Sequence, residues 1–241
     1  ALVGLHYGIQ LSRPRWGFRS DVGGNRTRWI IGGMMTLALG GVGATYAVTL
    51  FAVHYWLALI ASIVSYGLIG IGVGASGTSL LALLATATAA DRRAAAATIT
   101  WLMMIFGIAL TAGVAGQFLD PYSPQRLMTV VSVIALLAIL VTVLAIWNIE
   151  RAVSSRASEP NNTFQEALQE LWAESKTRNF TIFVFLSMNA YFMQELILEP
   201  YAGLVFGFTP GQSTSLSGAQ NGGVFVGMLT VGIMATGFKI G

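Results

Sequence analysis

Two glutamates inside a hydrophobic stretch are the side chains in this sequence best suited to chemistry. Glu195 and Glu199 lie four residues apart within the apolar run 180–206, so a helix places both on one face. A charged group at membrane depth costs about 2.5–3.5 kcal/mol, and such groups are usually paired or functional. We therefore expect this pair, with the nearby Gln194 and Asn189, to contact a ligand or a partner.

Three interpretations of the glutamate pair stay open on the sequence alone. A protonated pair satisfied by neighbouring helices would be structural, and a carboxyl that touches a ligand would be functional. A glutamate near the bilayer surface would simply reach water. Pro200 follows directly and has no amide N–H to donate to the carbonyl of Leu196, which predicts a kink there.

Composition places these residues in a membrane protein. Of 241 residues, 55% are hydrophobic and 10% are charged, whereas a soluble domain carries about 25% charged residues. The sequence has no cysteine and two histidines, too few for a transition-metal site built by the protein. The basic residues lie in short loops between apolar runs, so they indicate membrane topology and not nucleic-acid binding.

Apolar runs long enough to cross a bilayer core of about 30 Å must hold the candidate groups. We expect one partial span at residues 1–12, followed by six full spans. The full spans are expected at residues 29–53, 56–85, 94–119, 127–148, 180–206 and 214–238. Because the first residue already lies in an apolar run without an initiator methionine, we expect the chain to begin inside a longer polypeptide.

The distribution of lysine and arginine predicts the orientation of these spans. Twelve of the 13 basic residues lie in the loops 13–28, 86–93 and 149–179 or follow the last span, and Arg126 alone lies on the other side. Basic loops face the cytoplasm in bacterial inner membranes. The three loops are therefore expected to be cytoplasmic.

The long connection at residues 149–179 is expected to divide the chain into two parts. It separates the spans expected in residues 1–148 from those expected in residues 180–241. Thr163 and Glu166 match a helix capping box, and apolar residues follow on one face. An amphipathic helix is expected there, either on the membrane surface or against the ends of the bundle.

The first loop reads GFRSDVGGNRTRW and resembles the G-x-x-x-D-x-x-G-x-R motif between the second and third spans of major facilitator proteins. Gly17, Asp21, Gly24 and Arg26 occupy the four motif positions. The resemblance implies an all-α membrane protein, a major facilitator-type helical bundle seen in part. Residues 1–148 would then form the N-terminal half of the bundle without its first span, and residues 180–241 the start of the C-terminal half. Asp21 would then cap a helix or pair with Arg26 and influence the conformation of the bundle.

Two longer stretches resemble the PucC and LhaA family of phototrophic bacteria. They are HYGIQLSRPRWGFRSDVGGNRTRWIIGG at residues 6–33 and QELILEPYAGLVFGFTPGQSTSLSGAQNGG at residues 194–223. The resemblance implies an assembly factor for a bacterial light-harvesting antenna that binds antenna polypeptides and delivers (bacterio)chlorophyll, and not an enzyme. It also implies a photosynthetic or intracytoplasmic membrane, with the core complex and pigment-synthesis enzymes as further partners.

Under this resemblance, the candidate cofactors are bacteriochlorophyll or chlorophyll, with carotenoid or lipid as others. Magnesium accepts oxygen ligands, so Glu195 is a candidate contact to a pigment magnesium, and His6 could bind it through a ring nitrogen or serve in packing. A stripe of small residues could accept a neighbouring helix or a flat macrocycle. That stripe is Gly67, Gly70, Gly74 and Gly77.

A secondary transporter of a small solute or pigment precursor is the alternative function, and a passive scaffold subunit is a third. The spans between residues 29 and 148 contain essentially no acidic or basic side chain away from their ends. Proton-coupled transporters keep titratable groups on their path, so this composition favours the assembly factor.

Overall fold

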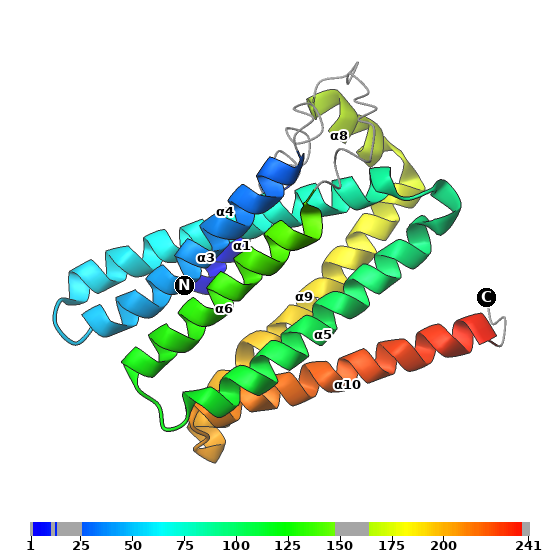
Figure 1. Cartoon of the computed structure of the whole chain (residues 1–241). Coiled ribbons are helices and arrows are strands. Elements are labelled where there is room, and N and C mark those ends of the chain that lie inside the picture. Colours follow the sequence, from blue (N-terminus) through cyan, green and yellow to red (C-terminus); the bar gives the residue numbers. More distant parts are fainter. Residues whose placement is uncertain (1, 11–12, 14–25, 148–163, 238–241) are drawn as a thin grey trace. The chain divides into compact units, whose positions relative to one another are not determined.

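The computed structural model describes residues 2–10, 13, 26–147 and 164–237, and all regular secondary structure in these residues is helical (Figure 1). The expected all-α class is therefore confirmed. The helices are α1 (Leu2–Gln10), α3 (Arg26–Leu50), α4 (Tyr55–Ala87), the 3-10 helix η1 (Ala90–Arg92), α5 (Arg93–Leu119), α6 (Pro124–Ile146), α8 (Phe164–Ala173), α9 (Ser175–Phe206) and α10 (Pro210–Gly237).

Five of the described helices are long and apolar enough to cross a membrane, which makes this an all-α membrane protein. They are α3, α4, α5, α6 and α9. The sixth expected span, at residues 214–238, corresponds to α10, which has 28 residues but is not among the five. Its first half is rich in serine, threonine, glutamine and asparagine, and two of these side chains, Ser213 and Asn221, are buried in protein contacts.

Helix α9 begins earlier than the sequence predicts and ends at a glycine cap. It begins at Ser175, five residues before the start of the expected apolar span at Phe180. The polar residues 175–179 are therefore helical as well. It ends at Phe206 and is capped by Gly207, whose φ of 68° is a left-handed conformation that glycine adopts without a steric cost. The helix continues through Pro200 to this end, and the kink expected at the proline remains a prediction.

Contacts divide the chain into two compact units. The first unit is Ala1–Arg93 with Leu127–Ala167, and the second unit is Ala94–Arg126 with Leu168–Gly241. Helix α6 therefore groups with α1, α3 and α4, whereas α5 groups with α9 and α10. The division at residues 148 and 180 expected from the sequence remains a prediction.

Glycines bring α3 and α4 into backbone contact in the first unit. A methyl group at Gly72 would lie 2.5 Å from the backbone nitrogen of Leu37, and one at Gly33 would lie 2.6 Å from that of Ser76. A methyl group at Gly40 would lie 2.8 Å from backbone atoms of α4 in the same way. Such close approach is how helices associate in lipid, where apolar side chains gain little by meeting each other.

The glycine stripe expected on α4 has one residue that faces α1 and two that are buried. A methyl group at Gly67 would meet Ile9 of α1 at 3.8 Å, and no other described residue lies within 4 Å of the position it would take at Gly77. Gly70 and Gly74 are buried. Helix α3 packs against Gly72 of α4, and the use of the stripe by a neighbouring helix or a macrocycle remains a prediction.

Arg26 connects the start of α3 to the end of α4. Its Nη1 donates a hydrogen bond of 2.6 Å to Oγ1 of Thr86, in the last turn of α4. A cation at this end of a helix also interacts favourably with the helix dipole. The other three motif residues, Gly17, Asp21 and Gly24, lie outside the described residues, so their conformational role remains a prediction.

The amphipathic helix expected in the long connection is present as α8. It runs from Phe164 to Ala173, while Thr163 of the capping box lies outside the described residues. Among the described helices, α8 separates its apolar and polar residues most strongly onto two faces. Its location at the membrane surface remains a prediction.

We expect opposite labelling at the two ends of α4 if the predicted orientation is correct. His54 precedes this 33-residue helix and Arg92 follows it; both are exposed, and a helix of that length spans about 50 Å. Because the chain has no cysteine, His54→Cys and Arg92→Cys each introduce one thiol. A membrane-impermeant maleimide should label only His54→Cys in right-side-out vesicles. Labelling of Arg92→Cys alone would show that the orientation is opposite to the predicted one.

Candidate functional site

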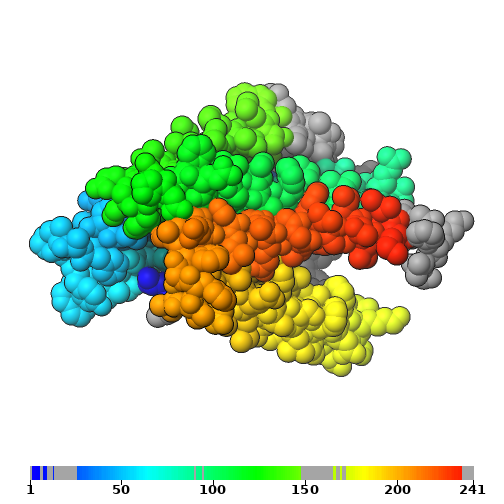
Figure 2. Space-filling view, turned by 90° about the horizontal axis from the view of Figure 1, so that it is seen from below, coloured from blue at the N-terminus to red at the C-terminus, as the bar shows by residue number. Residues whose placement is uncertain are grey.

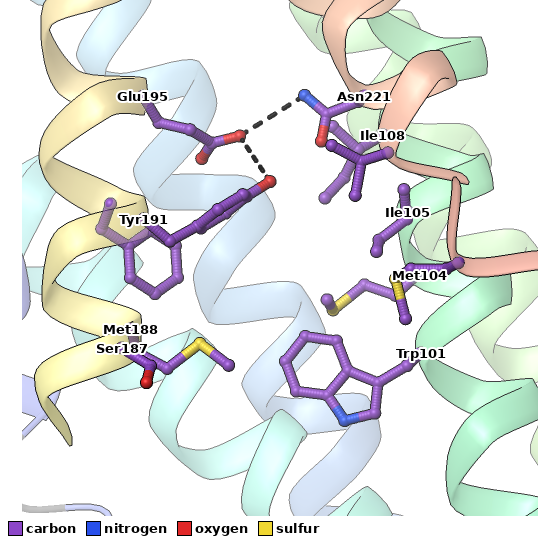
Figure 3. Close-up of a pocket in the computed structure, with 12 residues that line it drawn as sticks. Trp101, Met104, Ile105, Ile108, Ser187, Met188, Tyr191, Glu195 and Asn221 are labelled. Carbon is purple, nitrogen blue, oxygen red and sulfur yellow. Dashed lines mark hydrogen bonds between the residues drawn. The ribbon is translucent and has the colours of Figure 1, made fainter. Parts of the chain in front are cut away.

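A cavity of about 480 Å³ lies in the second unit among α5, α9 and α10 (Figure 3). Pockets that hold drug-sized ligands and cofactors occupy about 300–1,000 Å³. The lining residues are Trp101, Met104, Ile105 and Ile108 from α5; Ser187, Met188, Tyr191, Phe192 and Glu195 from α9; and Asn221, Val224 and Met228 from α10. The lining is apolar over most of its surface and contains a single carboxyl group.

Helical spacing explains why these side chains share one cavity. The lining positions on α5 recur every three or four residues, from Trp101 to Ile108, and those on α9 recur in the same way from Ser187 to Glu195. This spacing gives each helix one continuous face. Tyr191 and Glu195 project from α9 toward α10, and Trp101 lies at the opposite end of the cavity (Figure 3).

Small residues bring the first half of α10 into backbone contact with the second half of α5. A methyl group at Gly218 would lie 2.7 Å from the backbone nitrogen of Gly113, and one at Gly116 would lie 2.7 Å from the carbonyl oxygen of Gly211. Farther along, the Phe106 and Phe225 rings pack with their centroids 5.5 Å apart. The first half of α10 thus packs against protein, which agrees with its polar composition.

Asp120, the residue after α5, accepts one hydrogen bond from the turn between α9 and α10 and another from Arg126. Thr209 Oγ1 donates to Asp120 Oδ2 at 2.9 Å, and Arg126 Nη1 donates to the Asp120 carbonyl oxygen at 2.6 Å. From this turn α9 and α10 diverge, as Figures 1 and 2 both show. The cavity lies where the two helices separate and α5 faces both of them.

The two glutamates each have a polar partner on α10. Glu195 Oε1 accepts from Tyr191 Oη at 3.3 Å and from Asn221 Nδ2 at 3.4 Å, both long hydrogen bonds. Glu199 Oε1 accepts from Ser217 Oγ at 2.8 Å. Ser217 and Asn221 are themselves four residues apart, so the two pairs form successive contacts between α9 and α10. None of the twelve lining residues is basic.

The structure brings one of the five candidate contact residues to the cavity. Glu195 lines it, whereas Glu199 lies one turn further along and contacts Ser217 without lining it. Gln194 and Asn189 are exposed and are not lining residues, because their positions on α9 are rotated away from the face of Glu195. His6 belongs to α1 in the first unit. Ligand contact by these residues remains a prediction.

Sequence reasoning missed the partners of Glu195. Tyr191 lies one helical turn before it, and that spacing could have identified the tyrosine. Asn221 is 26 residues away on a different helix, and no local pattern joins the two positions. The cavity methionines, Met104, Met188 and Met228, were also missed, since methionine is common in any apolar helix.

The cavity is lined mostly by apolar side chains. No three histidine, aspartate or glutamate side chains gather into a metal-binding group in the part of the chain that the structure describes. A chlorophyll-type macrocycle carries its own magnesium, so the protein would need to supply a single oxygen ligand. Glu195 is the lining residue that carries a carboxyl oxygen.

Comparison with known proteins decides the family. The model of the PUCC protein family matches residues 1–241, the whole of this chain. This chain belongs to the PUCC family. The resemblance noted in the two sequence stretches is thereby confirmed, and the PUCC assignment together with the five apolar helices identifies a multi-pass bacterial membrane protein.

Individual relatives support this assignment. The chain is 62% identical to the bacteriochlorophyll synthase 44.5 kDa chain of Rhodobacter capsulatus, over all of this chain and 56% of that protein. It is 28% identical to Protein PucC of Rhodobacter capsulatus over 67% of this chain and 36% of that protein. It is 25% identical to Protein PucC of Cereibacter sphaeroides over 92% of this chain and 52% of that protein.

The chain therefore spans about half the length, or less, of the curated relatives it matches. No solved structure matches this chain. The major facilitator-type arrangement of the helices, which was expected from the first-loop motif, accordingly remains a prediction.

Proposed function

We propose that this PUCC-family protein is an assembly factor for a bacterial light-harvesting antenna and that it holds a chlorophyll-type pigment in the cavity among α5, α9 and α10. The observation that carries the proposal is the cavity itself, which is apolar, lies in the second unit and has one carboxyl group in its lining. The relative that is 62% identical is named for bacteriochlorophyll synthase, which supports a pigment as ligand.

The side chains of the cavity suit a macrocycle. Trp101 and Phe192 offer flat apolar surfaces against which a ring can stack. The three cavity methionines are flexible and polarizable, so they adapt to a rigid ligand of irregular outline. Glu195 would bind the pigment magnesium through a carboxylate oxygen or, when protonated, donate to a carbonyl at the ring edge.

The proposed partners are the proteins that would supply the pigment and those that would receive it. Antenna polypeptides would receive the pigment within a photosynthetic or intracytoplasmic membrane, and pigment-synthesis enzymes would supply it. The core complex is a further proposed partner. A lipid-embedded cavity suits this transfer, because an apolar macrocycle held there never has to cross water.

Filling the cavity is the test of this proposal. In the full-length protein expressed in a phototrophic host, Met104→Trp adds a bulky side chain to the lining, whereas Met103→Trp places the same side chain on a neighbouring residue that is 69% exposed and does not line the cavity. After purification in mild detergent, wild type should copurify with pigment and antenna polypeptides. Met104→Trp should retain at least about fivefold less pigment, because the added volume excludes the ring.

The matched control decides the interpretation. Met103→Trp should keep the wild-type absorption spectrum and the wild-type set of copurifying polypeptides. Equal pigment content in both variants at equal protein level would contradict the cavity as the pigment site. Colourless wild-type protein that takes up a solute in liposomes would favour the transporter instead.

A further inference from the structure

Helices α5 and α10 pack together as one wall of the cavity. Their backbones approach so closely that a methyl group at Gly218 would lie 2.7 Å from the nitrogen of Gly113 and 3.0 Å from its Cα. Farther along the same two helices, the Phe106 and Phe225 rings pack with their centroids 5.5 Å apart. Because two helix backbones in contact cannot shift past each other without a clash, the α5–α10 wall moves as one body.

Helix α9 is packed far more loosely. Ala202 is its one buried residue, and no residue in the long segment 175–201 is buried. Two hydrogen bonds join this segment to α10. Ser217 Oγ donates to Glu199 at 2.8 Å, and Asn221 Nδ2 donates to Glu195 at 3.4 Å. These two pairs, which we call the latch, hold α9 to α10 through polar side chains, whereas α10 is held to α5 through its backbone.

The turn between α9 and α10 divides between Phe208 and Thr209. The Phe208 N–H donates to the carbonyl oxygen of Ala202 at 3.2 Å, which joins Phe208 to α9. The Thr209 N–H donates to Gln212 Oε1 at 3.0 Å and the Gln212 N–H donates to Thr209 Oγ1 at 3.2 Å, which is a capping box at the start of α10. Thr209 Oγ1 also donates to Asp120 after α5. The chain therefore passes from α9 to the α5–α10 wall at a single peptide bond.

The cavity is open along its side. Five of its lining residues are 37–45% exposed, and all five are apolar. They are Trp101, Met104, Met188, Phe192 and Met228. The opening lies where α9 and α10 diverge from their common turn (Figures 1 and 2). An apolar molecule dissolved in the membrane would cross this rim without passing through water.

We propose that α9 is a hinged gate of the cavity, which turns at the Phe208–Thr209 junction against the fixed α5–α10 wall and is held closed by the latch. This inference rests on the proposed role of the cavity as a ligand site and adds how that site opens to a membrane-dissolved ligand. Helix α9 has 32 residues, so a small rotation at the junction moves its far end widely. Phe183 lies about 37 Å along the helix from the junction, and a turn of about 10° displaces it by about 6 Å.

Distances between spin labels test the gate on the full-length protein in lipid nanodiscs. Phe183→Cys with Val231→Cys places labels on exposed positions of α9 and α10, and Met103→Cys with Val231→Cys is the control pair on α5 and α10. This chain has no cysteine, and any cysteine elsewhere in the protein would be replaced. In wild type, double electron–electron resonance should resolve a second α9–α10 distance, longer than the first by about 5 Å or more. The control pair should give one distance.

Two hydroxyl deletions on α10 assign the motion to the latch. Ser217→Ala removes the donor to Glu199, whereas Thr230→Ala removes a hydroxyl whose hydrogen bond stays within α10. Loss of one hydrogen bond should raise the share of the longer distance about threefold or more in Ser217→Ala. Thr230→Ala should match wild type. A single α9–α10 distance in wild type would overturn the gate, and an equal change in the control pair would do so as well. Ser217→Ala with the wild-type distribution would overturn the latch.

The outcomes separate the gate from the proposed function. Two α9–α10 distances in the nanodiscs, combined with unchanged pigment in Met104→Trp, would keep the gate and remove the pigment role of the cavity. A single distance, combined with loss of pigment in Met104→Trp, would do the reverse.

Discussion

Replacing Gly72 with alanine is expected to lower the free energy of unfolding by about 3 kcal/mol, an effect at the upper end of those measured for overpacking. The added methyl group would lie 2.5 Å from the nitrogen of Leu37 and 2.7 Å from the carbonyl oxygen of Gly33, both in the backbone of α3. A flexible side chain could turn aside, but a helix backbone has to move as a whole. The α3–α4 pair would therefore separate.

Gly77 on the same helix provides the matched control. No described atom outside its own helix neighbourhood lies within 4 Å of the position of the added methyl group. Alanine favours a helix over glycine by about 0.8–1 kcal/mol, so Gly77→Ala should be neutral or stabilising. Unfolding in mixed detergent micelles would measure both variants. Equal stability of Gly72→Ala and Gly77→Ala would contradict the close contact between the helices.

Replacing Glu195 with alanine is expected to reduce the pigment retained after purification by about tenfold or more. The change removes the only carboxyl group that lines the cavity and leaves Tyr191 Oη and Asn221 Nδ2 without their shared acceptor. Tyr191 Oη then loses the hydrogen bond that it donates, whereas Asn221 Nδ2 keeps its bond to the Ser217 carbonyl oxygen. The ratio of pigment absorption to protein in the purified full-length protein is the measurement.

Glu195→Gln separates the roles of charge and of hydrogen bonding. Glutamine keeps an oxygen that accepts from Tyr191 and Asn221 but cannot carry a negative charge. If oxygen ligation or hydrogen bonding holds the pigment, glutamine should retain much more of it than alanine. If the charge is required, both variants should fail alike.

Glu199→Ala is the neighbouring control for this experiment. Glu199 contacts Ser217 and does not line the cavity, so its loss should affect pigment less than the loss of Glu195. Wild-type pigment content in Glu195→Ala, at normal protein level, would remove Glu195 from the site. A larger effect at Glu199 than at Glu195 would move the site along α9.

The polar side chains in the first half of α10 bind this helix to its neighbours. Ser213, Ser217 and Asn221 lie there, with Ser217 and Asn221 in hydrogen bonds to α9. In an apolar solvent such side chains need partners within the protein, so they bind α10 to its neighbours. The same residues that keep α10 from resembling an apolar span therefore hold it against α9 beside the cavity.

The sequence by itself determined the features that depend on local composition. Runs of apolar residues predict helices that cross a membrane, because the cost of unpaired backbone groups in lipid excludes other structures. Five of the described helices meet this expectation. Glu195 was recognisable for the same reason, since a carboxyl group within an apolar run is costly wherever its neighbours lie.

Only the tertiary structure decided which faces meet. Helical periodicity gives the residues that share a face but not the rotation of that face toward a neighbour, so the close contact of α3 at Gly72 could not be predicted from the sequence. For the same reason Gln194 and Asn189, close to Glu195 in sequence, do not line the cavity, whereas Asn221, 26 residues away, does. The partner of a side chain in lipid is set by helix packing, and packing joins residues that no local spacing connects.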